Sequence, residues 1–209
     1  MPTYRHTLGT GKRFHRIHIP RTGGRYFHEN IQINKWLPEQ VFESVHIEGV
    51  EIQHFHRQLY EEHLNINGIP SIAIVRHPIS RFIASSMFLT AFHKLNLAGQ
   101  SDLQELMESD GFFEIMNNMG CYDSEMVNWF RPQVDFLSED THVWKIEDGL
   151  GYNFGEWVGK ILKVPFSMYK TSYLPLQFLD ESDRLTATPE LIKNIRKYYS
   201  EDFKKLSYD

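Results

Sequence analysis

Residues 13–27 read RFHRIHIPRTGGRYF, and this stretch decides how the chain begins to fold. Arg13–Ile19 has the β-compatible side chains of a strand, which a proline ends. A glycine pair at 23–24 follows, and Arg25–Lys35 then places apolar residues at helical spacing. The stretch therefore predicts a strand, a glycine loop and a helix N-terminus, an arrangement that binds anions.

A second strand is predicted at Ser71–Val75, where a short apolar run is flanked by glycine and proline residues. Such a run suits a central strand that is buried on both faces. The other predicted elements continue the alternation. Strands are expected at Val41–Ile47, Val50–Phe55 and His142–Ile146, and helices at Arg57–Leu64, Ile79–Leu97, Asp102–Met116 and Phe154–Leu162, with a C-terminal helix after Thr188-Pro189.

This alternation predicts an α/β fold in which a central, mainly parallel sheet is flanked by helices in three layers. The sequence has no internal repeat, low-complexity tract or long linker, so we expect a single domain over residues 1–209. Ligands of such sheets bind at the carboxyl ends of the strands. The segments that follow Ile19 and Val75 are therefore the candidate places for a site.

The composition predicts a soluble, cytoplasmic protein without general affinity for polyanions. The 209 residues include 22 Lys and Arg against 27 Asp and Glu, which gives a net charge of -5 and argues against nucleic acid as a partner. Cys121 is the only cysteine, so we expect no intrachain disulfide and a reducing compartment. The N-terminal region has no long apolar run, so neither a secretory signal nor a membrane partner is expected.

The loop after the first strand has the composition of a phosphate or sulfate site. Between His18 and Arg25 it combines two glycines, the hydroxyl of Thr22 and the guanidinium groups of Arg21 and Arg25. The alternative is an ordinary strand-to-helix turn with solvated arginines. The second strand is followed by Arg76, which can bind a phosphate through two parallel hydrogen bonds or simply lie on the surface.

Together these segments resemble the sulfotransferases that use 3'-phosphoadenosine 5'-phosphosulfate (PAPS), especially the carbohydrate sulfotransferases of the heparan 2-O and chondroitin groups. The family motif P-K-T-G-G-T, which cradles the 5'-phosphosulfate, is similar to Pro20–Arg25. The motif V-R-D-P-x-x-R-x-x-S, which binds the 3'-phosphate, is similar to Val75–Ala84. The resemblance implies a P-loop-like fold with PAPS as the cofactor and 3'-phosphoadenosine 5'-phosphate (PAP) as its product.

The resemblance also implies cofactor contacts at individual positions. They are Arg21, Thr22, Gly23, Gly24, Arg25 and Tyr26 for the 5'-phosphosulfate, and Arg76 and Ser85 for the 3'-phosphate. Arg21 stands at the family's lysine position, so it is expected to stabilise leaving-group charge rather than donate a proton. Arg25 replaces a hydroxyl residue, and Ala84 stands at the usual serine position, next to Ser85.

A histidine is the catalytic base that the resemblance implies. Gln53–His56 is similar to the family segment that precedes the second motif's strand and holds this base. His54 is the first candidate and His56 the alternative, because an imidazole can take the proton of an acceptor hydroxyl as its oxygen attacks sulfur. The residues leave open that one of the two histidines is merely packed. The spacing of His and Cys predicts no metal site.

Two later segments extend the resemblance. Trp129–Gln133 is similar to the family's R-P-Q region, which implies that Arg131 and Gln133 bind the acceptor, with structural hydrogen bonding on a loop as the alternative. Val143–Asp148 resembles a family strand that ends in E-D, and Tyr198–Phe203 is similar to a C-terminal Y-x-x-D-F motif that is expected to pack.

The implied function is direct, in-line transfer of the sulfuryl group of PAPS to a hydroxyl acceptor, with a carbohydrate as the preferred acceptor. One rival is a noncatalytic nucleotide-binding or regulatory protein with the same fold. Another is a P-loop kinase, suggested by the sequence GTGK at residues 9–12. The Walker A motif requires Ser or Thr after its lysine, and Arg13 stands there, so ATP hydrolysis is not expected. The sequence leaves the oligomeric state open.

Overall fold

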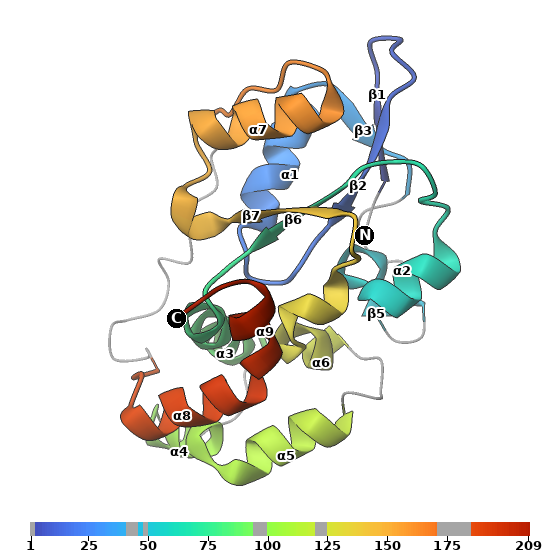
Figure 1. Cartoon of the computed structure of the whole chain (residues 1–209). Coiled ribbons are helices and arrows are strands. Elements are labelled where there is room, and N and C mark those ends of the chain that lie inside the picture. Colours follow the sequence, from blue (N-terminus) through green and yellow to red (C-terminus); the bar gives the residue numbers. More distant parts are fainter. Residues whose placement is uncertain (1–2, 41–45, 48–49, 94–99, 120–124, 171–184) are drawn as a thin grey trace. The chain divides into compact units, whose positions relative to one another are not determined.

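The computed structural model describes residues 3–40, 46–47, 50–93, 100–119, 125–170 and 185–209. The chain divides into two compact units, and each is described by itself. Unit 1 comprises Met1–Arg76 and Asp135–Tyr173, and unit 2 comprises His77–Val134 and Leu174–Asp209. In the described ranges unit 1 holds the sheet, whereas unit 2 is built mainly from helices (Figure 1). The single domain expected over residues 1–209 stays a prediction.

The sheet of unit 1 is open and has five strands in the order β3-β1-β2-β6-β7. Their bounds are Trp36–Pro38 (β3), Thr3–His6 (β1), Arg13–Ile17 (β2), Ser71–Val75 (β6) and Thr141–Lys145 (β7). β2, β6 and β7 are parallel neighbours, but β1 is antiparallel to both β2 and β3. The α/β class is confirmed. The prediction that the sheet is mainly parallel is wrong, because the sheet is mixed and only β2, β6 and β7 run parallel to one another.

A hairpin joins β1 to β2 and makes this pair antiparallel. Gly9 and Gly11 have φ of 74° and 65°, and the N–H of His6 donates to the carbonyl of Lys12 over 3.0 Å. Glycine adopts such left-handed conformations without steric cost, so the chain can turn back directly from β1 into β2. The segment that suggested a kinase is therefore a hairpin connection.

Helices lie on both faces of this sheet. α1 (Gly24–Ile33) and α7 (Tyr152–Leu162) share one buried cluster with the strands, which includes Phe14, Phe27 and Phe154 (Figure 1). Strand alternation sends His15 to the opposite face, where its ring meets Tyr60 of α2 (Arg57–His63) at 4.8 Å between centroids. Unit 1 is thus a sheet with helical layers on each side.

Most predicted elements of unit 1 are confirmed within one to three residues. All five residues of β6 are buried, as a central strand requires. Val50–Phe55 is not a single strand, because β5 (Val50–Glu51) gives way to the 3-10 helix η1 (Ile52–His54). Of the strand expected at Val41–Ile47, only β4 (His46–Ile47) lies in the described ranges, where it pairs with β5.

Unit 2 has an aromatic core. The described helices are α3 (Pro78–His93), α4 (Gln100–Glu108), α5 (Asp110–Met119), α6 (Glu125–Phe130), α8 (Pro189–Tyr198) and α9 (Ser200–Lys205). Phe82, Phe130 and Tyr199 are buried at its centre. The helix expected at Asp102–Met116 is divided at Ser109, whose hydroxyl donates to the Leu106 carbonyl over 2.7 Å and accepts from the Phe112 N–H over 3.2 Å. Cys121 lies outside the described residues.

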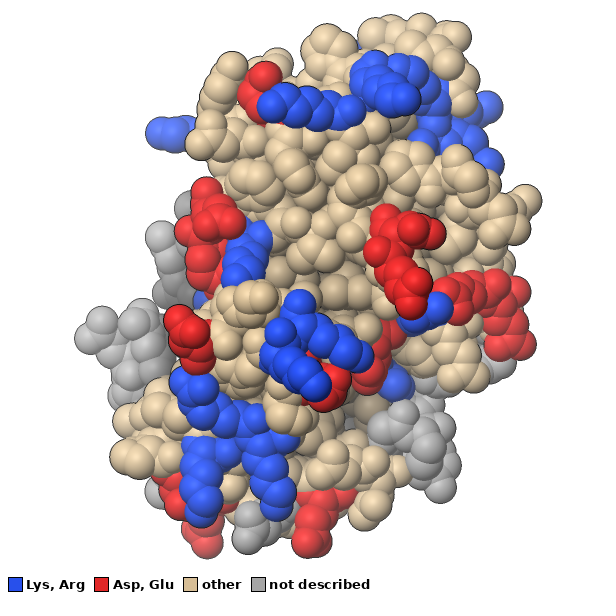
Figure 2. Space-filling view, viewed as in Figure 1, with Lys and Arg blue, Asp and Glu red and all other residues tan. Residues whose placement is uncertain are grey.

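The C-terminal helix begins as the sequence predicts. The Thr188 hydroxyl accepts the N–H of Leu191 over 3.2 Å, and Pro189 occupies the first turn. Figure 2 shows Lys and Arg side chains gathered over α8 and α9. Two of them form ion pairs, Lys193 with Glu190 at 3.1 Å and Lys205 with Glu201 at 3.3 Å. No helix in the described ranges has the length and apolar character needed to cross a membrane.

Candidate functional site

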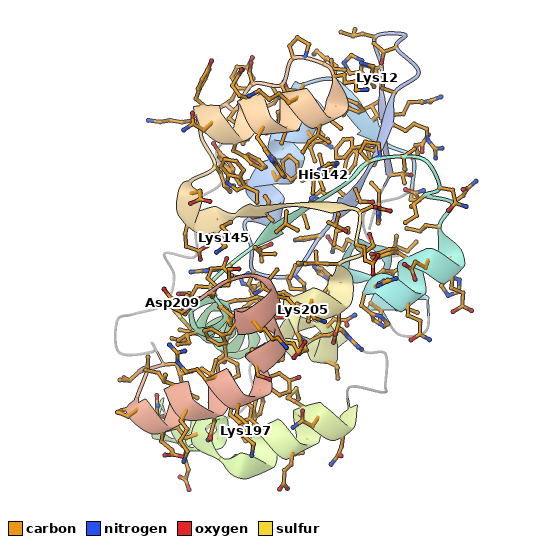
Figure 3. The ribbon with its side chains drawn as sticks, viewed as in Figure 1. Lys12, His142, Lys145, Lys197, Lys205 and Asp209 are labelled. Carbon is orange, nitrogen blue, oxygen red and sulfur yellow. The ribbon has the colours of Figure 1, made fainter. Side chains whose placement is uncertain are left out.

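Three segments of unit 1 follow neighbouring parallel strands. The loop 18–23 follows β2, Arg76 follows β6, and the 3-10 helix η3 (Ile146–Asp148) follows β7. Figure 3 marks Lys145, the last residue of β7, and His142 near its beginning. Because parallel strands end at the same edge of a sheet, these segments come together there, where open α/β sheets bind their ligands.

The loop after β2 shares a feature with anion-binding nests: left-handed residues flank Thr22. Arg21 has φ of 67° and Gly23 has φ of 84°. Alternation of left- and right-handed conformations turns successive N–H groups toward one point. The Thr22 hydroxyl donates to the carbonyl of Ile19 over 2.8 Å, and Gly23 is the N-cap of α1. The loop therefore presents backbone donors at a helix N-terminus.

Gly24 is held against two basic side chains. A β-carbon at this position would lie 1.9 Å from Nε2 of His18 and 2.6 Å from Nη2 of Arg16. The same Arg16 nitrogen donates to the Gly24 carbonyl over 2.6 Å. The second glycine of the motif is thus required by close packing, since no side chain fits between the loop and these groups.

Arg16 places a buried cation beneath the start of α1. The residue is only 1% exposed, and its guanidinium carbon lies 5.7 Å from the centre of the Phe27 ring. Burial lowers the pKa of Arg16, an effect that its interaction with Tyr4 opposes. The Tyr4 hydroxyl is 2.7 Å from Nδ1 of His28, whose pKa burial and Arg16 lower to about 4. Sequence reasoning missed this group, although strand alternation puts Arg16 on the buried face of Phe14.

Two histidines meet beside the loop. The rings of His18 and His54 have centroids 4.8 Å apart and an interplanar angle of 45°. Burial, followed by the charges of Arg16 and His54, lowers the pKa of His18 well below its usual range. Nδ1 of His54 lies 3.8 Å from a carboxylate oxygen of Glu51. His56, the alternative base, is buried at the N-cap of α2. The structure thus brings His54 to the predicted loop.

Arg76 also reaches the loop. Its Nη1 atom donates to the carbonyl of Arg21 over 3.4 Å, and its side chain is partly buried. Burial lowers the pKa of Arg76, while the nearby charge of Glu147 raises it. Arg25 is exposed, and Tyr26 directs its hydroxyl to the Tyr169 carbonyl over 2.9 Å. The two motifs of the sequence are therefore in contact within unit 1.

The other predicted contacts belong to unit 2, where all three are buried. The Ser85 hydroxyl donates to the Trp129 carbonyl over 2.9 Å. Nε of Arg131 donates to Oδ1 of Asn128 over 2.7 Å. The backbone and side chain of Gln133 donate to Asp202 over 2.9 and 3.3 Å. These are structural hydrogen bonds, the alternative weighed for Arg131 and Gln133, and a ligand role for the three stays a prediction.

We expect the left-handed conformation of Arg21 to be measurable as strain. A non-glycine residue at φ of 67° lacks the freedom of glycine, a difference of about 1 kcal/mol. Arg21→Gly should therefore be more stable than Arg21→Ala by about that amount, although both lose the same guanidinium group. Equilibrium urea denaturation of the two variants measures the difference. Equal stabilities would contradict the strained loop conformation.

The donors at this edge of the sheet are backbone N–H groups, guanidinium groups and imidazoles, which suit an anion. Across the described ranges, no three His, Cys, Asp or Glu side chains are placed to hold a metal ion. No protein-family model, no curated protein and no solved structure matches this chain.

Proposed function

We propose that this chain is a PAPS-dependent sulfotransferase that transfers a sulfuryl group to a hydroxyl acceptor, with a carbohydrate as the preferred acceptor. The observation that carries the proposal is the contact between the two motifs: Arg76 donates to the carbonyl of Arg21 in the glycine loop. A P-loop-like, three-layer fold is part of the proposal. Helices on both faces of the sheet and a parallel β2-β6-β7 core support it.

The proposed nucleotide site uses different donors for its two anionic groups. The nest around Thr22 and the first turn of α1 would hold the 5'-phosphosulfate through backbone N–H groups, with Arg21 and Arg25 adding charge. Arg76 would bind the 3'-phosphate through its guanidinium group. Arg16 would strengthen the field at the helix N-terminus, because a buried charge is weakly screened.

When bound, PAPS supplies the sulfuryl group. His54 would take the proton of the acceptor hydroxyl as the acceptor oxygen forms a bond to sulfur. Transfer would leave the electron pair of the broken sulfur–oxygen bond on the phosphate of PAP. Arg21 would stabilise that negative charge without giving up a proton, since guanidinium stays ionised. His56 is the second candidate for the base.

Calorimetric titration with PAP tests the nucleotide site. We expect the folded protein to bind PAP in preference to ATP. Arg76→Ala should weaken binding by about 10- to 100-fold, because a hydrogen bond to a charged group contributes about 1.5 to 3 kcal/mol. Arg13→Ala is the matched control, since Arg13 begins β2 at the end away from the loop and pairs with Glu39 at 2.6 Å.

The outcomes separate the proposal from its rivals. Failure of the folded wild type to bind PAP would overturn the sulfotransferase proposal. Equal losses in Arg76→Ala and Arg13→Ala would remove Arg76 from the site. If PAP binds and a screen of hydroxyl acceptors with PAPS shows no transfer, the noncatalytic nucleotide-binding protein is the better description. Transfer that is lost in His54→Ala would support the complete proposal.

A further inference from the structure

We infer that Glu51 is a positioning residue that orients His54 as the base, so that the two side chains act as a carboxylate–imidazole pair. The inference rests on the function proposed above and names a residue that the sequence motifs do not include. It starts from one distance: a carboxylate oxygen of Glu51 lies 3.8 Å from Nδ1 of His54.

Local structure brings the two side chains to the same side of the chain. Glu51 ends β5 and is the N-cap of η1, and His54 is the last residue of that single 3-10 turn. Side chains three residues apart eclipse each other in a 3-10 helix. The pair is therefore built within one short turn of the chain.

Neighbouring groups fix both members of the pair. The side-chain amide of Gln53 donates to the same carboxylate oxygen of Glu51 that faces His54. On the other side, the His18 ring packs against the His54 ring. Burial keeps His18 neutral by lowering its pKa, so His18 does not compete for the proton. Glu51 and His54 retain only 27% and 13% of their side-chain exposure, which limits their freedom to turn away.

This arrangement assigns different tasks to the two ring nitrogens of His54. A carboxylate facing Nδ1 favours the tautomer that carries its proton there, which leaves the lone pair on Nε2 to accept the proton of the acceptor hydroxyl. Glu51 itself touches neither donor nor acceptor in this scheme, so it acts only through His54.

Nitrogen-15 NMR of the imidazole rings tests the pair without requiring turnover. At pH 8, where an ordinary imidazole is neutral, His54 of the wild type should carry its proton on Nδ1. Glu51→Ala should shift the population toward the Nε2–H tautomer, and Glu51→Gln should retain the Nδ1–H form because its amide oxygen can still face Nδ1. The exposed Glu62 on α2 provides the matched control, Glu62→Gln, which should change nothing.

A wild-type His54 in the Nε2–H form, or one that Glu51→Ala leaves unchanged, would overturn the inference. PAP titration of the same samples keeps the proposed function apart from it. Glu51→Ala should bind PAP within about twofold of wild type, since Glu51 is not a nucleotide ligand. If His54 has the expected tautomer and the protein does not bind PAP, the pair is supported and the sulfotransferase proposal is refuted. If the protein binds PAP and His54 has the Nε2–H tautomer, the pair is refuted and the nucleotide site is supported.

Discussion

Acidification below pH 6.5 is expected to destabilise unit 1 strongly, with His15 as a main cause. Burial lowers the pKa of His15 from 6.5 to about 3 in the folded state. Between these values the unfolded chain binds the proton and the folded chain does not, so stability rises with pH and is lost as pH falls. This one group removes roughly 4 to 5 kcal/mol from pH 6.5 to pH 3, at about 1.4 kcal/mol for each unit of pKa difference.

The contribution of His28 has the same sign. Its pKa is lowered from 6.5 to about 4, so its neutral form is also favoured in the folded state and its stabilising effect is lost below pH 6.5. The buried carboxyl of Asp202 in unit 2 has the opposite sign. Burial raises its pKa above 3.8, so the protonated form is favoured by folding and stability falls as pH rises through the raised pKa. Acid sensitivity should therefore be greater in unit 1.

The variant His15→Phe isolates the contribution of His15 to the acid sensitivity of unit 1. Phenylalanine can keep the contact with Tyr60, whose ring is 4.8 Å away, and loses only the long Nδ1 contact with the Ser71 hydroxyl at 3.3 Å. The variant should lose much less stability than wild type between pH 7 and pH 4. His142→Phe is the matched control, because His142 is exposed on β7 and its removal should leave the acid sensitivity intact.

Urea denaturation followed by tryptophan fluorescence measures the difference, since three of the four tryptophans (Trp36, Trp144 and Trp157) lie in unit 1. A wild type and a His15→Phe variant that lose equal stability on acidification would show that His15 is not protected from protonation by the fold.

Local sequence patterns were sufficient for the parts of unit 1 that frame the site. β6 is a continuous apolar run between residues that break regular structure, and all of it is buried. The loop before α1 was predictable because glycine and proline act on the backbone where they stand. The same is true of Thr188 and Pro189 at the start of α8. Each of these sequence signals depends only on residues that are a few positions apart.

The antiparallel strands escaped prediction because their pairing is not local. β1 and β3 are short, and β1 has three buried residues out of four, with no regular alternation of buried and exposed positions. Tyr4 becomes buried through its pairing opposite Phe14 and its contact with His28, which the sequence around it does not reveal. A short polar strand gains its stability from partners supplied elsewhere in the chain.

The site residues divide in the same way. Some are predicted by the sequence around them, and others are identified only by contacts with residues far away in the chain. Arg21 and Arg76 were predicted from the segments in which they occur. Arg16 was not among the predicted site residues, since a charged side chain in a strand gives no sign of burial until Phe27 and Tyr4 are in place. The contact of His18 with His54 joins segments 36 residues apart in sequence, and only the fold reveals it.

Gly24→Ala is expected to damage both the stability of unit 1 and its anion site. The new β-carbon would lie 1.9 Å from Nε2 and 2.2 Å from Cδ2 of His18, and 2.6 Å from Nη2 of Arg16. The His18 ring cannot simply move away, because it packs against His54. Overpacking of this kind costs about 1 to 3 kcal/mol. Gly111→Ala is the matched control, with its nearest contact at an ordinary 3.9 Å.

A second substitution tests whether the damage arises from this contact. His18→Ala removes the nearest obstacle, while the Arg16 contact involves only the end of a flexible side chain. In a double-mutant cycle measured by urea denaturation, Gly24→Ala should therefore cost less in the His18→Ala background than in wild type, by about 1 kcal/mol or more. Additive losses would place the cause elsewhere in the loop. PAP affinity should fall at least about 10-fold in Gly24→Ala, since the displaced loop no longer aligns its N–H donors. If that affinity survives the loss of stability, the nest around Thr22 does not bind the phosphosulfate.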